Sequence, residues 1–340
     1  MADPSPSPSP SPSSSRRRLT VVYNPLRVDD LDDARTVVAK ACADNGWADP
    51  EWVETTAEET GERQAQDAVA AGADVVASLG GDGTVRAVAS ALVGTDVALG
   101  LLPGGTGNLL ARNLGIPVGS LDDAARAVVE GQDRRIDVGA VRLADSLPEP
   151  ESSRATKDSP RGVADDEEVF LVMTGLGVDG EIMASTDEKV KEKVGWVAYV
   201  LAAVKKLSGR GFPVEVRSSG GDGVVGGAGD TLRRRARGVI VGNCGTLQGG
   251  VELMPQAVVD DGRIDAVVLA PRGAFGWASV VVDVATRHHA GHQRLDRLVA
   301  EQLTIVAEHA VEAEIDGDPV GPHRVLTARV VPGALVVRSG

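Results

Sequence analysis

The chain has 340 residues, of which 42% are hydrophobic, and this is enough apolar material for two folded domains. Its formal net charge of -14 at pH 7 argues against a nucleic-acid-binding protein, because a phosphate backbone requires a basic surface. The two cysteines, Cys42 and Cys244, stand far apart and match no zinc-binding or redox pattern, which favours a reducing cytoplasm.

The first segment, residues 1–18, begins with alternating serine and proline and ends with three arginines. It offers almost no apolar side chains to a core, so we expect it to be a disordered tail. The apolar run that follows, LTVVY, is too short for the hydrophobic part of an export signal. No segment reaches the roughly 18 consecutive apolar residues of a membrane span, so we expect membrane contact to be peripheral.

Residues 19–137 alternate between strand and helix patterns. The first helix pattern has Asp29 or Asp30 as its N-cap and ends at Gly46, the second covers 58–71, and another covers 120–131. The runs ADVVASL and VALGLL are wholly apolar, which is typical of central parallel strands that are covered on both faces. We therefore predict a doubly wound α/β domain.

Residues 138–340 contain many short β-like runs separated by turn residues, which predicts a second domain, a β-sandwich or a barrel. Helix patterns interrupt them over 187–207 and 274–288, and polar segments over 145–168 and 218–237 indicate loops between strands. The final strands are candidates for a return to the first domain.

Two glycine-rich loops each follow an apolar strand and precede a helix: GGDGT at 80–84 and PGGTGN at 103–108. Glycines let backbone amides approach a phosphate, and a helix N-terminus favours its charge, although tight turns without a ligand have the same composition. Neither loop matches the dinucleotide or the Walker pattern. The carboxylate of Asp82 fits beside phosphates when a cation lies between them, so we predict that Asp82 helps to hold magnesium.

Six elements occur in one order: Tyr23-Asn24-Pro25, GGDGT, PGGTGN, Asp137 in RIDVG, MPQAVVDDGRID and EIDGDP. In this combination the chain resembles the diacylglycerol kinase catalytic family, the soluble bacterial lipid kinases that are also similar to sphingosine kinases. The resemblance covers nearly all of residues 19–340. Because NAD kinases share GGDGT, an NAD kinase is one alternative. A catalytically weak nucleotide-binding regulatory protein is another.

The resemblance implies an NAD-kinase-like α/β domain over 19–137 and a C-terminal β-sandwich over 138–340, with ATP in the cleft between them. It implies ATP and magnesium as cofactors and a lipid alcohol, diacylglycerol or a sphingoid base, as the phosphoryl acceptor. It also implies a cytoplasmic protein that associates peripherally with the inner face of the membrane, with no nucleic acid as partner, and it is compatible with a homodimer.

The resemblance further implies roles for single residues. Asp316 corresponds to the proton acceptor. A magnesium loop is implied in VVDDGRI, where Asp261 supplies its side chain and Val258 and Arg263 supply carbonyls, and Asp82 and Asp137 are further candidate metal ligands. The residues implied in nucleotide binding are Asn24, Thr56, Gly81, Asp82, Gly83, Thr84, Thr106 and Asp318.

The chain departs from the family pattern at some of these positions. The family motif ends in DGE, whereas this chain has Asp318, one methylene shorter, at its last position. The segment NPLRVDD lacks the serine and glycine that usually follow the first motif. Taken alone, Asp261 and Asp316 could be ordinary turn aspartates, because Asp-Gly is a strong hairpin signal. Phosphoryl transfer needs positioned phosphates, a metal and a base, which the combined motifs supply.

Overall fold

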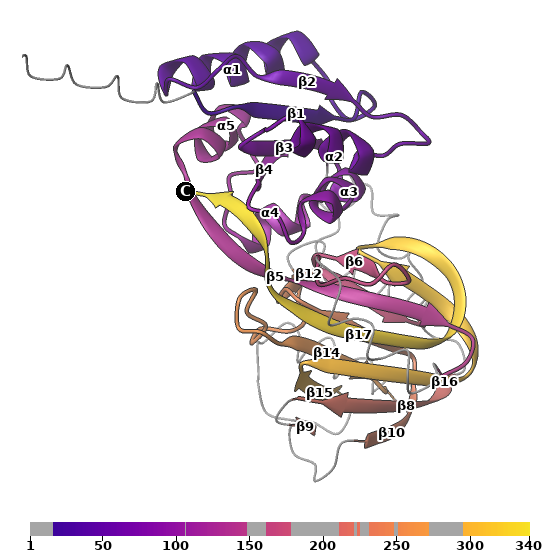
Figure 1. The fold of residues 1–340 in the computed structure, drawn as a ribbon. Coiled ribbons are helices and arrows are strands. Elements are labelled where there is room, and N and C mark those ends of the chain that lie inside the picture. The colour runs from indigo at the N-terminus through magenta and orange to yellow at the C-terminus, as the bar shows by residue number, and fades with distance from the viewer. Residues whose placement is uncertain are drawn as a thin grey trace, which may run out of the picture.

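Four short strands in the first part of the chain form a parallel sheet in the computed structural model (Figure 1). Every residue of β1 and β3 is buried, whereas β2 lies at the edge and keeps exposed residues. The spatial order is β2-β1-β3-β4, and the strands are β1 (Leu19–Tyr23), β2 (Glu51–Glu54), β3 (Val75–Gly80) and β4 (Ala98–Pro103).

Helices cover both faces of this sheet, which confirms the predicted doubly wound α/β domain (Figure 1). On one face lie α1 (Leu31–Asp44) and α5 (Leu121–Glu130), and on the other α2 (Glu62–Ala70), α3 (Asp82–Leu92) and α4 (Leu109–Asn113). Asp30 and Ser120 are N-caps, as the sequence predicts. The Asp30 carboxylate accepts a hydrogen bond from the Asp33 amide, and the Ser120 hydroxyl accepts one from the Asp123 amide.

The second helix is shorter than predicted. We expected it to begin at residue 58, but α2 begins at Glu62. Thr56 and Glu59 instead close a turn, in which the Glu59 amide donates to the Thr56 hydroxyl at 3.0 Å and the Thr56 amide donates to the Glu59 carbonyl at 3.0 Å. Gly61, at φ 135°, is then the N-cap of the helix. The turn occupies residues that the helix pattern could have used, and it places threonines at the mouth of the sheet.

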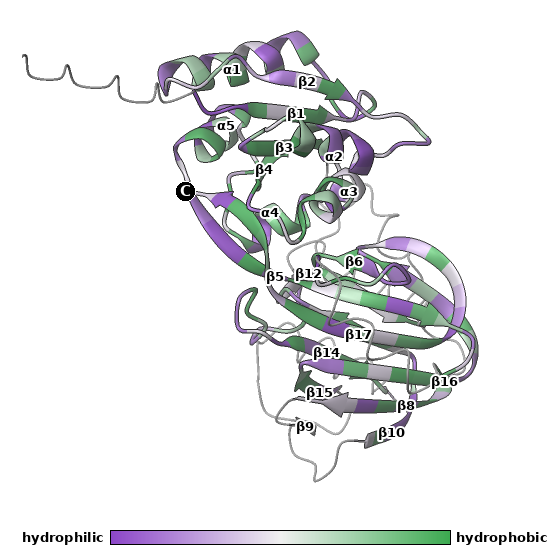
Figure 2. Ribbon diagram, viewed as in Figure 1, coloured by the Kyte–Doolittle hydropathy of each residue, from purple (hydrophilic) through white to green (hydrophobic). Residues whose placement is uncertain are grey.

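The second part of the chain forms antiparallel strands around a separate apolar core, which confirms the β-sandwich (Figure 2). Hydrophobic residues alternate with polar ones along strands such as β8, as expected for strands with one face in a core. The strands are β5 (Gln132–Ala144), β6 (Glu168–Phe170), β7 (Met173–Leu176), β8 (Phe212–Ser219), β9 (Gly223–Val224), β10 (Thr231–Ala236), β11 (Gly238–Gly242), β12 (Thr246–Leu247), β13 (Val251–Glu252), β14 (Ile264–Leu269), β15 (Leu295–Ala300), β16 (Gln302–Ile315) and β17 (Asp318–Ser339).

Two long strands, β5 and β17, run from one domain into the other (Figure 1). They pair with each other in antiparallel register, with a bulge between Val331 and Leu335. At its end β17 lies parallel to β4, where Val337 is opposite Leu99. The parallel sheet and the sandwich are therefore joined in one continuous sheet, and the boundary we expected at residue 137 falls inside β5.

Arg338 fastens the end of β17 to the first domain. Its guanidinium donates to the carbonyls of Val128 at 2.8 Å and Val129 at 3.1 Å, and it forms an ion pair with Asp133 at 2.8 Å. The two carbonyls belong to the last turn of α5, where carbonyls lack partners within the helix. A buried cation at this end of a helix also complements the helix dipole.

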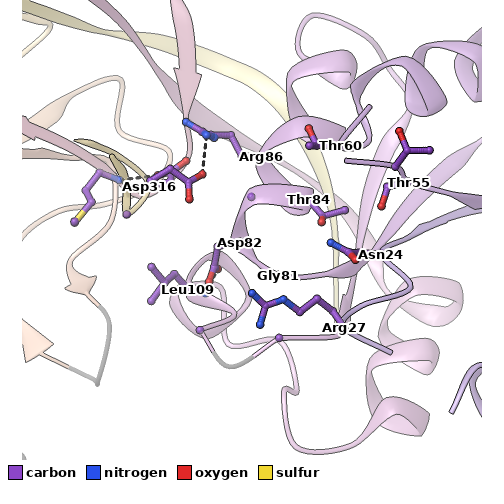
Figure 3. Close-up of a pocket in the computed structure, with 17 residues that line it drawn as sticks. Asn24, Arg27, Thr55, Thr60, Gly81, Asp82, Thr84, Arg86, Leu109 and Asp316 are labelled. Carbon is purple, nitrogen blue, oxygen red and sulfur yellow. Dashed lines mark hydrogen bonds and ion pairs between the residues drawn. The ribbon is translucent and has the colours of Figure 1, made fainter. Parts of the chain in front are cut away.

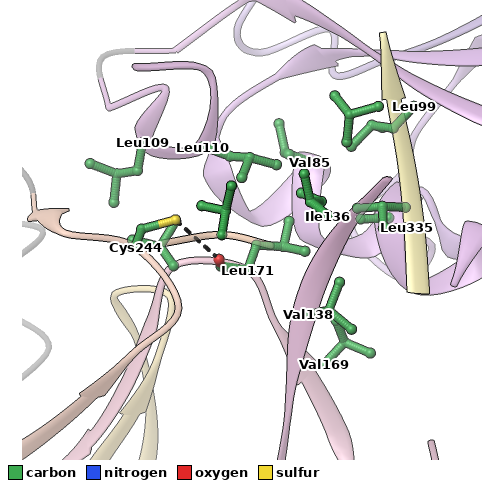
Figure 4. Close-up of a cluster of buried hydrophobic side chains, with 14 of the residues drawn as sticks. Val85, Leu99, Leu109, Leu110, Ile136, Val138, Val169, Leu171, Cys244 and Leu335 are labelled. Atoms are coloured by element: carbon green, nitrogen blue, oxygen red, sulfur yellow. Dashed lines mark hydrogen bonds between the residues drawn. The ribbon is translucent and has the colours of Figure 1, made fainter. Parts of the chain in front are cut away.

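An apolar cluster fills the junction between the domains (Figure 4). Val85 of α3 and Leu110 of α4 pack in the same cluster as Leu171 and Cys244 of the second domain, and all four are buried. The Cys244 thiol donates to the Leu171 carbonyl at 3.5 Å, and burial raises the pKa of this thiol. The thiol therefore behaves as a small apolar side chain of the core.

The carboxylate of Asp137 connects three segments at the same junction. One oxygen accepts the Gly262 amide and the other accepts the Gly333 amide, both at 2.7 Å. Its own backbone amide donates to the Val259 carbonyl at 2.7 Å, and its carbonyl accepts from Asn243 at 2.9 Å. Asp137 is therefore a buried link between β5, the loop before β14 and the bulge of β17.

Replacing Asp137 with alanine leaves two amides without their charged acceptor. We expect Asp137→Ala to lower the free energy of unfolding by about 3 kcal/mol or more, because each hydrogen bond to a charged group contributes about 1.5–3 kcal/mol. Urea titration measures this. The control is Asp96→Ala, which removes an exposed ion pair with Arg135 and should cost no more than about 1 kcal/mol. Equal losses in the two variants would contradict the role given to Asp137.

The structure describes residues 16–105, 107–147, 161–177, 211–220, 223–224, 231–247, 251–271 and 295–340. The helices predicted over 187–207 and 274–288 lie outside these ranges, as do residues 1–15 of the predicted tail. Within the described ranges, no helix combines the length and the hydrophobicity needed to span a bilayer.

Candidate active site

A cavity of about 430 Å³ lies between the two domains, at the carboxyl ends of β1, β3 and β4 (Figure 3). This edge of an open α/β sheet is where ligands characteristically bind. The cavity brings together residues from both glycine loops, from the turn at 55–60 and from the turn between β16 and β17. The sequence-predicted residues that line it are Asn24, Thr56, Gly81, Asp82, Gly83, Thr84, Asp316 and Asp318.

The two glycine loops press against each other. A Cβ added to Gly105 would come within 2.8 Å of the Gly81 Cα, so the close approach of the two backbones requires glycine at this position. A Cβ added to Gly107 would collide with the Asp82 carboxylate, which would have to move. Gly81 is the N-cap of α3 and has no side chain to cap it, and the first residues of this helix line the cavity. The arrangement is suited to an anion. Thr106, between these glycines, lies outside the described residues.

Asp82 has a structural partner in addition to its predicted role. Its Oδ1 accepts the backbone amide of Leu109, the first residue of α4, at 2.7 Å. The carboxylate thus ties the first glycine loop to the helix that follows the second. Burial raises the pKa of Asp82, while the amides of Leu109 and Asn108 oppose the rise.

Asp316 projects from the turn between β16 and β17 and is held by three backbone amides. Leu171 donates to Oδ2 at 2.9 Å, and Val172 and Met173 donate to Oδ1 at 2.8 and 3.0 Å. The turn places Asp316 at φ 51° and Gly317 at φ 89°, and both values lie in the left-handed region. Burial raises the pKa of Asp316, and the three amides act in the opposite direction. The carboxylate is therefore fixed in orientation and nearly enclosed.

An ion pair crosses the cavity from one domain to the other. Arg86 of α3 reaches Asp318, at the start of β17, with 2.8 Å between Nη2 and Oδ2. Sequence analysis assigned no role to Arg86, nor to Arg27, Thr55, Thr60 or Met173, which also line the cavity. Helical spacing could have indicated Arg86, because it lies one turn after Asp82 on the same face. Thr55 and Thr60 lie on either side of Thr56. Their place in the cavity depends on the turn that replaces the predicted start of α2, so the sequence alone did not indicate it.

The predicted magnesium loop lies apart from the residues that line the cavity. Asp261 Oδ1 accepts the Arg263 amide at 3.0 Å, and Val258 is exposed. Burial raises the pKa of Asp261, and the nearby charge of Asp137 adds to the rise. Burial likewise raises the pKa of Asp265 to about 6, with the charge of Asp261 adding to it. These carboxylates repel one another, a condition that a bound cation would relieve.

Within the described ranges, no three histidine, cysteine, aspartate or glutamate side chains are grouped to hold a metal ion. A magnesium site in this loop would therefore depend on backbone carbonyls as well as on Asp261. The Asp137 carboxylate has both oxygens engaged by amides, so its role as a metal ligand stays a prediction.

Comparison with known proteins places these features in a family. Residues 18–141 match the model of the diacylglycerol kinase catalytic domain, and residues 172–339 match that of the YegS C-terminal NAD kinase beta sandwich-like domain. A "Probable lipid kinase YegS-like" from Pseudomonas putida is 30% identical over 310 residues, which cover 90% of this chain and 89% of that protein. The chain belongs to the diacylglycerol kinase catalytic-domain family.

Other members of the diacylglycerol kinase family show the same extent of likeness. A protein of the same name from Pseudomonas fluorescens is 29% identical over 284 residues, 81% of each chain. The crystal structure of a diacylglycerol kinase from Bacillus anthracis str. Sterne superposes with a TM-score of 0.70 at 22% identity, over 95% of this chain and 97% of that chain. At this identity the superposition shows the fold.

In this member of the diacylglycerol kinase family, a buried glutamate lies directly under the turn that carries Asp316. Glu314 Oε2 accepts the Gly317 amide at 2.7 Å, and Oε1 is buried without a hydrogen-bond partner among the residues described. Burial raises the pKa of Glu314 to about 8, and the charge of Asp316 adds to the rise. The carboxyl group is therefore mostly protonated at neutral pH.

This raised pKa predicts a pH-dependent stability. The pKa of Glu314 rises from its ordinary 4.5 to about 8 in the folded state, so folding loses stability as the pH increases between these values. Glu314→Gln keeps an acceptor for Gly317 and removes the titration. We expect its melting temperature to exceed that of the unaltered protein at about pH 8 and to converge with it near about pH 4.5.

Thermal melts across this pH range compare the two proteins, with Glu312→Gln, an exposed change on the same strand, as control. A constant difference between Glu314→Gln and the unaltered protein at every pH would show that Glu314 does not titrate in this window.

Proposed function

We propose that this protein catalyses ATP-dependent phosphoryl transfer to the hydroxyl group of a lipid alcohol such as diacylglycerol or a sphingoid base. The observation that carries the proposal is that one cavity contains both the glycine loops and the enclosed carboxylate of Asp316. The loops come from the first domain and the carboxylate from the second. A phosphate donor and a hydroxyl acceptor could thus meet between them.

Family membership supports a kinase, and the names of the curated relatives support a lipid as its acceptor. Neither distinguishes diacylglycerol from a sphingoid base. A lipid acceptor also supports peripheral contact with the inner face of the membrane. The cytoplasmic location and the homodimer stay predictions.

The residues of the cavity fit a nucleotide. Gly81, Gly83 and Thr84 lie at the N-terminus of α3, where backbone amides and the helix dipole favour phosphate oxygens. Thr55 and Thr60 bring hydroxyl groups to the same cavity. The close packing of Gly105 on Gly81 leaves no side chain over the first loop.

The same cavity fits magnesium, which prefers oxygen ligands. Asp82 and Asp318 both line it, and they are close enough for the charge of Asp318 to raise the pKa of Asp82. When bound there, magnesium would neutralise phosphate charge and orient the phosphate oxygens. Asp82 and Asp318 are the residues that would hold it.

Asp316 is suited to accept the proton of the acceptor hydroxyl. Its Oδ1 accepts two amides, whereas Oδ2 accepts one. A carboxylate oxygen has two lone-pair positions, so Oδ2 keeps one for the hydroxyl. Burial raises the pKa of Asp316, which makes it a stronger base than an exposed aspartate. The three amides fix its direction before the substrate arrives.

The proposal predicts that Asp316→Asn separates chemistry from binding. We expect turnover to fall about 100-fold or more while the affinity for ATP changes little, because an amide cannot accept the proton. We would measure turnover with diacylglycerol, a sphingoid base and NAD as acceptors. Calorimetric titration would measure the affinity for ATP. Full turnover of the variant, or loss of ATP binding, would contradict the assigned role. Activity of the unaltered protein with NAD alone would favour the NAD kinase alternative.

The magnesium loop predicts a second, independent result. We expect added magnesium to raise the melting temperature of the unaltered protein and to raise that of Asp261→Asn by less, because a ligand stabilises the folded state that binds it and the variant has lost the site in this loop. Asp260→Asn is the matched control, since Asp260 is the neighbouring residue and pairs with Arg134 at the surface. An undiminished magnesium effect in Asp261→Asn would exclude this loop as the site.

A further inference from the structure

Arg86 occupies a defined place in the cavity although no motif points to it. It lies on α3 four residues after Asp82, which puts both side chains on the same face of the helix. Both line the cavity together with Thr84 and Asp316 (Figure 3). Arg86 therefore lies between the GGDGT loop of the first domain and the Asp316 carboxylate of the second domain.

The ion pair with Asp318 orients Arg86 more than it stabilises the fold. The side chain of Arg86 is 19% exposed, whereas that of Asp318 is 54% exposed. Solvent screens a pair with such an exposed partner, and pairs of this kind contribute little to stability. The contact through Nη2 nevertheless holds this end of the guanidinium beside Asp318.

The other terminal nitrogen of Arg86 lacks a hydrogen-bond partner in the described part of the protein. Nη1 is buried and has no hydrogen-bond partner among the residues that the structure describes. A guanidinium always carries its charge and has five N–H donors, so a buried, unpaired nitrogen is costly. A phosphate oxygen bound beside Arg86 would supply the missing acceptor once the guanidinium turns to expose Nη1 to the cavity.

Few cations among the described residues of the cavity are placed to bind a phosphoryl group. The described lining contains the carboxylates of Asp82, Asp316 and Asp318 but only two cations, Arg27 and Arg86. Arg27 is exposed on the loop after β1 and is drawn away from Asp316 in Figure 3. Arg86 is close enough to Asp316 for its charge to oppose the rise in the pKa of that carboxyl group that burial causes. Arg86 is therefore the cation at the end of the cavity where the acceptor hydroxyl is expected.

We propose that Arg86 is a catalytic residue whose guanidinium binds the phosphoryl group during its transfer, and that Asp318 is a positioning residue that aims it. The inference rests on the proposed function. In the transfer, the bond from the terminal phosphorus to the bridging oxygen of ATP breaks as the bond from phosphorus to the acceptor oxygen forms. The hydroxyl proton passes to Asp316, and ADP leaves. Arg86 stabilises the charge on the phosphoryl oxygens throughout.

The test compares Arg86→Gln and Arg86→Lys with the unaltered protein in lipid phosphorylation and in calorimetric titrations with ATP and with ADP. We expect Arg86→Gln to lower kcat about 100-fold or more, the scale for a lost transition-state donor, and to leave the KM for the lipid little changed. Affinity for ATP should fall more than affinity for ADP, which lacks the transferred group. Arg86→Lys should recover part of the loss, because it keeps the charge but not the fork.

The matched control is Arg63→Gln on α2, where an exposed arginine pairs with Glu59 away from the cavity, and it should behave as the unaltered protein. Asp318→Asn should lower kcat less than Arg86→Gln does, because the guanidinium of Arg86 remains in place. A kcat of Arg86→Gln within about threefold of normal, or equal losses of ATP and ADP affinity, would overturn the proposal. If the unaltered protein phosphorylates no lipid alcohol, the proposed function fails, and the comparison of ATP with ADP still decides whether Arg86 binds the terminal phosphoryl group.

Discussion

The pairing of β5 with β17 is the constraint on which the site depends. β17 begins two residues after Asp316 and ends beside β4, so one strand connects the candidate base to the sheet that carries the glycine loops. The Asp137 carboxylate locks the bulge of this strand to β5 and to the loop before β14. A hinge between two independent domains would leave the distance between base and phosphate variable, whereas a shared sheet fixes it, and catalysis is sensitive to displacements of about 1 Å.

The distribution of charge supports the proposal that a cation accompanies the nucleotide in this site. The described lining of the cavity carries more carboxylates than guanidinium groups, and the whole chain has a net charge of -14. A nucleotide is a polyanion, so it would be repelled by such a surface unless a divalent ion accompanies it. In the proposed complex, backbone amides, which carry no net charge, would then provide most of the phosphate contacts. Burial of Glu314 in its protonated form keeps a further negative charge away from the turn that carries Asp316.

The doubly wound domain, the sandwich and several of the residues that line the cavity could be predicted from the sequence, because those features depend on local pattern and short motifs. Sequence analysis did not predict relations between distant segments. Arg86 and Asp318 are separated by 232 positions, and nothing local to either indicates the other. The amide partners of Asp316 and Asp137 come from other strands, so they follow only from the topology. The predicted first residue of α2 was wrong, because a turn closed by the Thr56 side chain competes with the helix for these residues.

The return of β17 to the first domain also affects the order in which the protein can fold during synthesis. The ribosome releases the strands and helices of the α/β domain first, yet β4 lacks its neighbour and α5 lacks its Arg338 cap until the last strand has emerged. The unpaired edge of β4 is apolar and buried in the finished protein. An exposed apolar edge on a nascent chain is prone to mispairing, so the first domain stays partly assembled until β17 has been synthesised.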